Sequence, residues 1–126
     1  MPIPFRSDLQ TFLTEFIDQH RGLRLGKMFG LPAGYVGRRL FACLQEDGIL
    51  VRLPLDIARR EIRRGASPLS QRPGRPMGSW VMFKPRTAAA ARRLTPILEI
   101  AARNVAERQV EDMTGVSLPR PRRRVR

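Results

Sequence analysis

The feature that most limits the folds open to this chain is a series of short β-prone runs broken by glycine in its first half. Residues 23–29, 38–44 and 49–53 form such runs, and each is too short for an ordinary helix. Asp47-Gly48 separates the last two runs, and this dipeptide is favoured in tight hairpins because both residues tolerate positive φ. The pattern predicts an antiparallel sheet built from neighbouring hairpins.

A two-residue loop at this dipeptide would place Leu44 opposite Val51 and Ala42 opposite Leu53. Because side chains alternate between the two faces of a strand, the hairpin then has one aliphatic face and one mixed face. We expect helices to cover the aliphatic face, and a partner or a loop to cover the mixed face. The aliphatic face comprises Leu40, Ala42, Leu44, Val51 and Leu53; the mixed face comprises Phe41, Cys43, Leu50 and Arg52, of which Phe41, Cys43 and Leu50 form a candidate interface.

Helices are predicted on both sides of these strands in the sequence. Residues 7–21 carry one apolar stripe at helical spacing, and residues 56–64 form a shorter, basic helix. A C-terminal helix follows, which Pro96 interrupts or restarts. The expected boundary residues are Ser7 and Gln10 as a capping box, Gly22 and Gly65 as stops, and Asp56 and Thr95 as caps.

The segment between the last two helices divides into a loop and a strand. Residues 65–78 are rich in proline and glycine, which predicts a long loop, and residues 79–83 are β-prone. The fold class predicted for residues 1–115 is therefore α+β: a single domain with an antiparallel sheet of about four to five short strands, packed with an N-terminal and a C-terminal helix. Residues 116–126 are expected to form a disordered, basic Pro/Arg-rich tail.

Cysteine content and hydropathy indicate where the protein works. The single cysteine, Cys43, excludes an internal disulfide framework and fits a reducing compartment. The N-terminal residues lack the apolar region of a signal peptide, and no apolar run approaches the ~18 residues that span a bilayer. We therefore expect a cytoplasmic protein without a membrane partner.

The residues that common catalytic sites require are largely missing. Catalytic triads need a histidine base, and the only histidine, His20, lies at the end of the first predicted helix, where the helix dipole favours a cation. One cysteine, one histidine and scattered acids give no metal-ligand spacing. We expect no enzymatic activity, no cofactor and no metal.

Four glycines raise the question of whether the chain binds phosphate. Phosphate-binding loops run directly into a helix whose N-terminal amides face the anion. Here a predicted strand follows the last glycine, and the glycine spacing matches no phosphate-binding motif. Turns and a bulge between strands explain these glycines better. The four are Gly26, Gly30, Gly34 and Gly37.

The formal net charge of +13 predicts contact with nucleic acid or with an acidic partner. Arginine supplies 22 of the 24 basic residues, a bias that codon usage in a GC-rich genome would also produce. Tyr35 and Trp80 are the candidates for stacking on bases. The candidate phosphate contacts lie on the short helix and in the long loop, and are Arg59, Arg60, Arg63, Arg64, Arg72 and Arg75.

Two stretches of the chain resemble the TfoX/Sxy N-terminal domain family. They are residues 27–54, KMFGLPAGYVGRRLFACLQEDGILVRLP, and the later stretch PGRPMGSWVMF. The resemblance covers roughly residues 7–108 and implies a small α+β domain with no established catalytic activity. Longer members include regulators of natural competence in bacteria and carry a second, helical domain, so we expect here a stand-alone TfoX-like protein without it. We expect the positions that match the motif to be important for structure first and for function second. They are Met28, Phe29, Gly30, Phe41, Met77 and Trp80.

Two hypotheses for function follow. The first is a non-enzymatic regulatory domain that acts by binding a protein partner or a second copy of itself through the mixed face. The second is a nucleic-acid accessory protein that contacts phosphates through its arginine groups.

Overall fold

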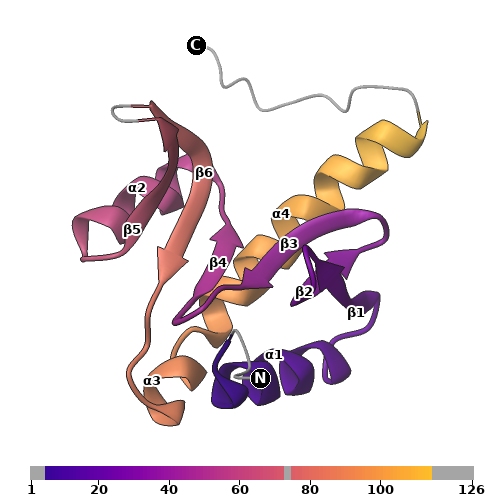
Figure 1. Ribbon diagram of the computed structural model, residues 1–126. Coiled ribbons are helices and arrows are strands. Elements are labelled where there is room, and N and C mark those ends of the chain that lie inside the picture. Colours follow the sequence, from indigo (N-terminus) through magenta and orange to yellow (C-terminus); the bar gives the residue numbers. More distant parts are fainter. Residues whose placement is uncertain (1–4, 73–74, 115–126) are drawn as a thin grey trace.

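The computed structural model describes residues 5–72 and 75–114, and it describes side chains for residues 5–68 and 79–107 (Figure 1). Along these residues the chain forms four helices and six strands. In chain order they are α1 (Ser7–Asp18), β1 (Leu23–Met28), β2 (Leu31–Val36), β3 (Arg39–Leu44), β4 (Ile49–Arg52), α2 (Leu55–Arg63), β5 (Ser67–Arg72), β6 (Arg75–Phe83), α3 (Ala88–Arg92) and α4 (Thr95–Thr114).

All six strands belong to one antiparallel sheet with the order β1-β2-β3-β4-β6-β5. The first four strands follow one another along the chain, β6 pairs next to β4, and β5 lies outside β6. This arrangement confirms the predicted α+β class, the single domain and the antiparallel sheet. The strand count is higher than the predicted four to five, because β2 and β5 form from segments whose glycine and proline content predicts turns and loops.

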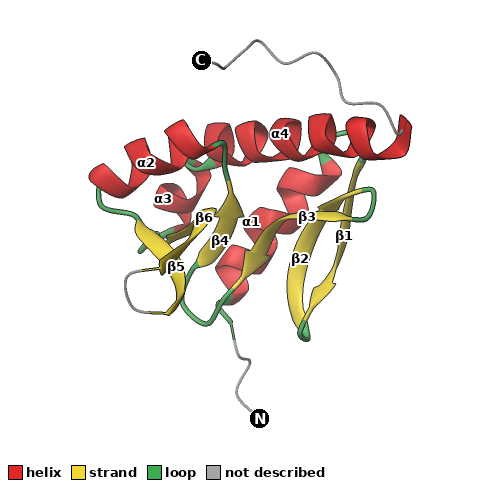
Figure 2. Cartoon of the chain, turned by 90° about the horizontal axis from the view of Figure 1, so that it is seen from above, coloured by secondary structure: helices red, strands yellow, loops and turns green. Residues whose placement is uncertain are grey.

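The helices pack on one face of the sheet. α4 contacts β2, β3 and β4, α2 contacts β6, and α1 contacts β1, β2 and α3. Figure 2 shows α2 and α4 together along one side of the strands. The largest fully buried side chains between the layers are Leu9, Leu13, Phe41, Leu44, Ile49, Val51, Leu53, Val81, Leu98 and Val105.

The β3–β4 turn lies one residue earlier than predicted. The Gln45 amide donates to the Gly48 carbonyl at 2.8 Å, so the central residues of the turn are Glu46 and Asp47. Gly48 has another reason to be glycine, because an added Cβ would clash with the Phe83 carbonyl oxygen. The close approach of β6, and not the turn, requires glycine at this position.

The new turn position also changes the predicted pairing of β3 with β4. Leu44 lies opposite Ile49, and Ala42 lies opposite Val51. The partners therefore shift by two residues. Because side chains alternate with a period of two, this shift leaves these side chains on their predicted face.

Residues 65–78, predicted as a loop, contain instead β5 and the first part of β6. Pro68 lies in the edge strand β5, and Pro76 lies in the part of β6 that precedes Trp80. That part pairs with β5 but extends beyond β4, whose pairing with β6 starts at Trp80. Both prolines thus have a neighbouring strand on one side only, where a sheet tolerates a missing N–H group.

The ends of α1 differ from the predicted caps. Arg6 is the N-cap residue, so Ser7 is the first helical residue and forms no capping box. The Arg6 guanidinium instead binds Asp8 in the first turn, with 2.6 Å between Nη2 and Oδ2. The helix ends at Asp18, and Gly22, with a φ of +86°, turns the chain into β1.

The later helices also differ from prediction in their caps. α2 begins after Pro54, so Asp56 lies in its first turn and does not cap it. Gly65, with a φ of +115°, is confirmed as the residue that turns the chain after α2. Thr95 is the first residue of α4 and therefore not its N-cap, and its hydroxyl donates to the Arg92 carbonyl at 2.8 Å.

Candidate interaction site

Phe41 lies in the core because β3 contains a bulge. The pairing of β2 with β3 shifts between Gly34 and Tyr35, where β3 holds one extra residue. The Phe41 ring is fully buried on the helix side, and its centroid lies 6.2 Å from that of Phe16. An added Cβ on Gly34 would lie 2.8 Å from this ring. The prediction that Phe41 belongs to an interface on the mixed face is therefore wrong.

The face of the sheet opposite the helices keeps the other two candidate interface residues, and we call it the helix-free face. Cys43 pairs with Leu50, and Leu50 pairs with Met82. Cys43 is 2% exposed, whereas Leu50 and Met82 are partly exposed. None of the described helices lies over this face (Figure 2). The bulge also puts Leu40 opposite Tyr35, so the prediction that Leu40 belongs to the helix-covered aliphatic face is wrong. The described side chains of the helix-free face include Arg24, Met28, Leu31, Ala33, Tyr35, Leu40, Cys43, Leu50, Arg52, Trp80 and Met82.

The Cys43 thiol serves as a packing group. Burial raises the pKa of this thiol, which disfavours the reactive thiolate. Its Sγ donates to the Leu44 carbonyl at 3.4 Å and accepts from Gln45 Nε2 at 3.6 Å. Contact area on the helix-free face is therefore supplied by the neighbours of Cys43 and not by the thiol.

Tyr35, a candidate for base stacking, has its ring and its hydroxyl occupied within the sheet. The ring lies over Gly26, where an added Cβ would be 2.9 Å away. The Arg24 guanidinium lies 4.7 Å from the ring centroid, and the Tyr35 hydroxyl donates to the Lys27 carbonyl at 2.7 Å. Tyr35 therefore braces β1 against β2 at the margin of the helix-free face.

The residues that match the family motif do not meet at one site. Met28, Phe29 and Gly30 lie at the β1–β2 turn, where Phe29 and Gly30 have φ values of +53° and +80°. The Phe29 side chain is 96% exposed. Trp80 lies in β6 on the far side of β4, and the Met77 side chain lies outside the described residues.

The arginines of α2 are divided by one acid. Arg59, Arg63 and Arg64 are exposed, and Arg60 is partly exposed. The Glu61 side chain, only 12% exposed, binds Arg60 Nε at 3.0 Å and Arg64 Nη1 at 3.3 Å. Arg59 and Arg63 remain as an outward pair one turn apart. The other predicted contacts, the side chains of Arg72 and Arg75 and the tail 116–126, lie outside the described residues.

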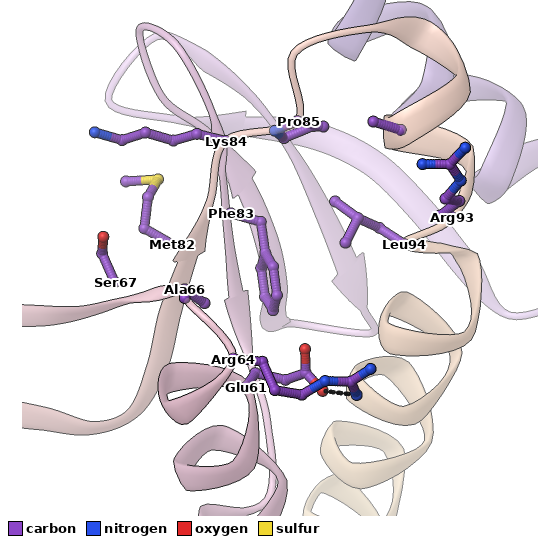
Figure 3. Close-up of a pocket in the computed structure, with 12 residues that line it drawn as sticks. Glu61, Arg64, Ala66, Ser67, Met82, Phe83, Lys84, Pro85, Arg93 and Leu94 are labelled. Carbon is purple, nitrogen blue, oxygen red and sulfur yellow. Dashed lines mark hydrogen bonds and ion pairs between the residues drawn. The ribbon is translucent and has the colours of Figure 1, made fainter.

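A cavity of about 350 Å³ lies between the end of α2, β6 and the α3–α4 corner (Figure 3). Phe83 and Leu94 point into it, with Arg64 at one end and Arg93 at the other. Lys84 also lines the cavity but extends to the other side of β6. Glu61 also lines the cavity and binds Arg64 at 3.3 Å, so Arg93 is the arginine of this lining that Glu61 does not bind.

His20 links the end of α1 to α4. Its Nδ1 donates to the Phe16 carbonyl at 2.7 Å, and its Nε2 lies 3.1 Å from a Glu99 carboxylate oxygen. The carbonyl first, and Glu99 second, raise the pKa of His20 above its ordinary value. The ring also stacks on Phe16 with 4.1 Å between centroids. α1 ends at Asp18, so His20 follows the helix instead of lying in its last turn as predicted, and its contacts are structural.

Within the described residues, no three His, Cys, Asp or Glu side chains are grouped as a metal site. None of the helices traced in those residues has the length and apolar character needed to cross a membrane. Comparisons with family models, with curated proteins and with solved structures found no match to this chain. The resemblance to the TfoX/Sxy family, the absence of catalysis and the cytoplasmic location therefore stay predictions.

Proposed function

We propose that the chain is a non-enzymatic, TfoX-like regulatory domain that associates with a second copy of itself through the helix-free face. The observation that supports this function is the apolar centre of that face. Leu50 and Met82 are partly exposed there beside the buried Cys43, and no described helix covers them. An apolar patch left open on a chain of net charge +13 is suited to a protein contact.

A second copy fits this surface for reasons of shape and charge. Two sheets pack face to face about 10 Å apart, and the small side chains of Ala33 and Cys43 leave room for the larger neighbours of a facing sheet. Arg24 lies on the edge strand β1, and Arg52 is the last residue of β4, one position beyond Leu50 on the same face, so a contact centred on Cys43 and Leu50 meets positive charge at its periphery. Aromatic side chains such as Trp80 are typical of interfaces.

Sedimentation velocity at rising protein concentration tests this assignment. The wild type should shift toward the mass of a dimer, and Leu50→Glu should stay a monomer because the new carboxylate would be buried in the contact. Leu55→Glu is the matched control, since Leu55 is also exposed but lies on α2. A wild type that sediments as a monomer at every concentration would falsify self-association.

Nucleic-acid binding is the second candidate function, and the outward arginines of α2 favour it. Arg59 and Arg63 are exposed one turn apart, and Arg64 lines a cavity with Arg93 on the opposite side. Such a surface would contact phosphates and read no base sequence.

A salt-dependent DNA titration tests this candidate. We expect affinity to fall steeply with salt, with a logarithmic slope of about −0.9 for each neutralised phosphate. The pair Arg59→Glu and Arg63→Glu should weaken binding more than the equally charged pair Arg92→Glu and Arg103→Glu. Equal losses in the two double variants, or binding that disappears when the chain ends at Pro119, would assign the affinity to general charge or to the tail.

A further inference from the structure

Phe29 occupies a position that folding does not favour. It lies in the two-residue turn between β1 and β2 with a φ of +53°, a region that bulky residues rarely adopt. Its side chain is 96% exposed, so burial does not offset this conformation. Asparagine before Gly30 would suit such a turn better. The phenyl ring at the tip therefore needs an explanation outside the fold.

The strand beside this tip is open for pairing. β1 is the first strand of the sheet order, and no described strand pairs with its outer edge (Figure 2). An open edge offers backbone N–H and C=O groups to an extended segment. Leu25, in the middle of β1, is 42% exposed. Leu25 and Phe29 are two of the three large apolar side chains that the described residues expose, and the third is Leu55.

The charge around this edge selects the partner. Residues 21–44 contain five basic residues and no acidic one. Arg24 and Lys27 are exposed along β1 itself. A second copy of this edge would bring only more positive charge, and like charges across paired strands are destabilising. An added strand with glutamate or aspartate side chains would match the charge.

The same edge fits a peptide better than a nucleic acid. The pairing of Ala33 with Cys43 places the β1–β2 turn at the same end of the sheet as the β3–β4 turn. That second turn carries the carboxylates of Glu46 and Asp47, of which Asp47 lies 3.8 Å from Lys84, so acidic groups at this end of the sheet disfavour a polyanionic nucleic acid. A peptide can place its apolar side chains at this end and its carboxylates beside Arg24.

We propose that the outer edge of β1, with Phe29 as its apolar anchor, binds an extended acidic segment of a partner protein by strand addition. Tyr35 holds β1 in place through its hydroxyl bond to the Lys27 carbonyl, which keeps a second lone pair for the added strand. The proposal rests on the assignment of the chain as an interaction domain. It adds a second surface, separate from the helix-free face.

Fluorescence anisotropy with a labelled peptide tests the proposal on the full chain. The probe is about nine residues of alternating valine and glutamate, long enough to lie along the six residues of β1. A control peptide has the same composition with its glutamates in one block, and a thymidine oligonucleotide is the nucleic-acid probe. We expect the alternating peptide to bind, and Phe29→Asn and Leu25→Glu to weaken it at least tenfold. Leu55→Asn should leave binding unchanged.

Three results would overturn the proposal. Equal affinity for the block peptide would reduce binding to general charge attraction. No binding of the alternating peptide would remove strand addition. Loss of oligonucleotide binding in Phe29→Asn, with peptide binding unaffected, would assign the tip to nucleic acid. Leu50→Glu separates the two surfaces, because it should abolish self-association and retain peptide binding.

Discussion

Replacing Phe29 by asparagine should make the protein more stable, although it removes a large apolar side chain. A left-handed backbone costs a non-glycine residue roughly 1–2 kcal/mol, and asparagine tolerates this region better than phenylalanine does. With Phe29 96% exposed, the burial lost is on the order of 10 Å², or about 0.2 kcal/mol. The expected net gain is about 0.3–0.8 kcal/mol.

Urea denaturation followed by circular dichroism measures this gain. For an m value of roughly 2 kcal/mol/M, the midpoint should rise by about 0.2–0.4 M with m unchanged. Leu55→Asn is the control, because Leu55 is also exposed and its φ is not positive. A lower midpoint for Phe29→Asn would show that the ring makes stabilising contacts within the domain and would refute the reasoning.

Three further predictions concern the core and the helix contacts. Gly34→Ala should destabilise the protein by about 1–3 kcal/mol, measured by urea denaturation, because its Cβ would press on the Phe41 ring. The contacts of protonated His20 stabilise the fold fully below the unfolded pKa of about 6.5, and this stability is lost as pH rises through the raised pKa of the folded state. The denaturation midpoint should therefore fall with rising pH in the wild type, and it should fall less in Glu99→Gln. Cys43 should react slowly with a thiol reagent in the native protein and rapidly in urea, as absorbance would show, and fast native reaction would contradict its burial.

The predictions that succeeded depend on local spacing. The apolar stripe of α1 and the β-prone runs of β3 and β4 repeat with the periods of helix and strand, so neighbouring residues suffice to identify them. Leu44 lies on its predicted face of the sheet although the turn was misplaced, because the misplaced turn changed its partner by two residues. The segments β2 and β5 were missed because proline and glycine predict turns. Pro32 and Pro68 are each paired with one neighbouring strand only, and Gly34, which is paired on both sides, makes room for the Phe41 ring.

The errors at the candidate site come from contacts between distant segments. The bulge that turns Phe41 into the core adds one residue to β3 and leaves no mark in its composition. Gly48 looks like a turn residue, but the backbone of β6 sets its requirement. For Phe29, the available signal was an aromatic residue directly before the glycine of a short turn, where asparagine is usual. The open edge of β1 depends on the strand order and could not be predicted from local pattern.

The position of α4 in the chain has a consequence for folding during protein synthesis. α4 is the last described element of the chain, yet Leu98, Ala101 and Val105 on it are buried against strands that leave the ribosome much earlier. While the chain is being made, β2, β3 and β4 therefore have part of their apolar side open to water and to other chains. A chain released before α4 has been made would carry an aggregation-prone sheet, and translation of α4 covers that sheet.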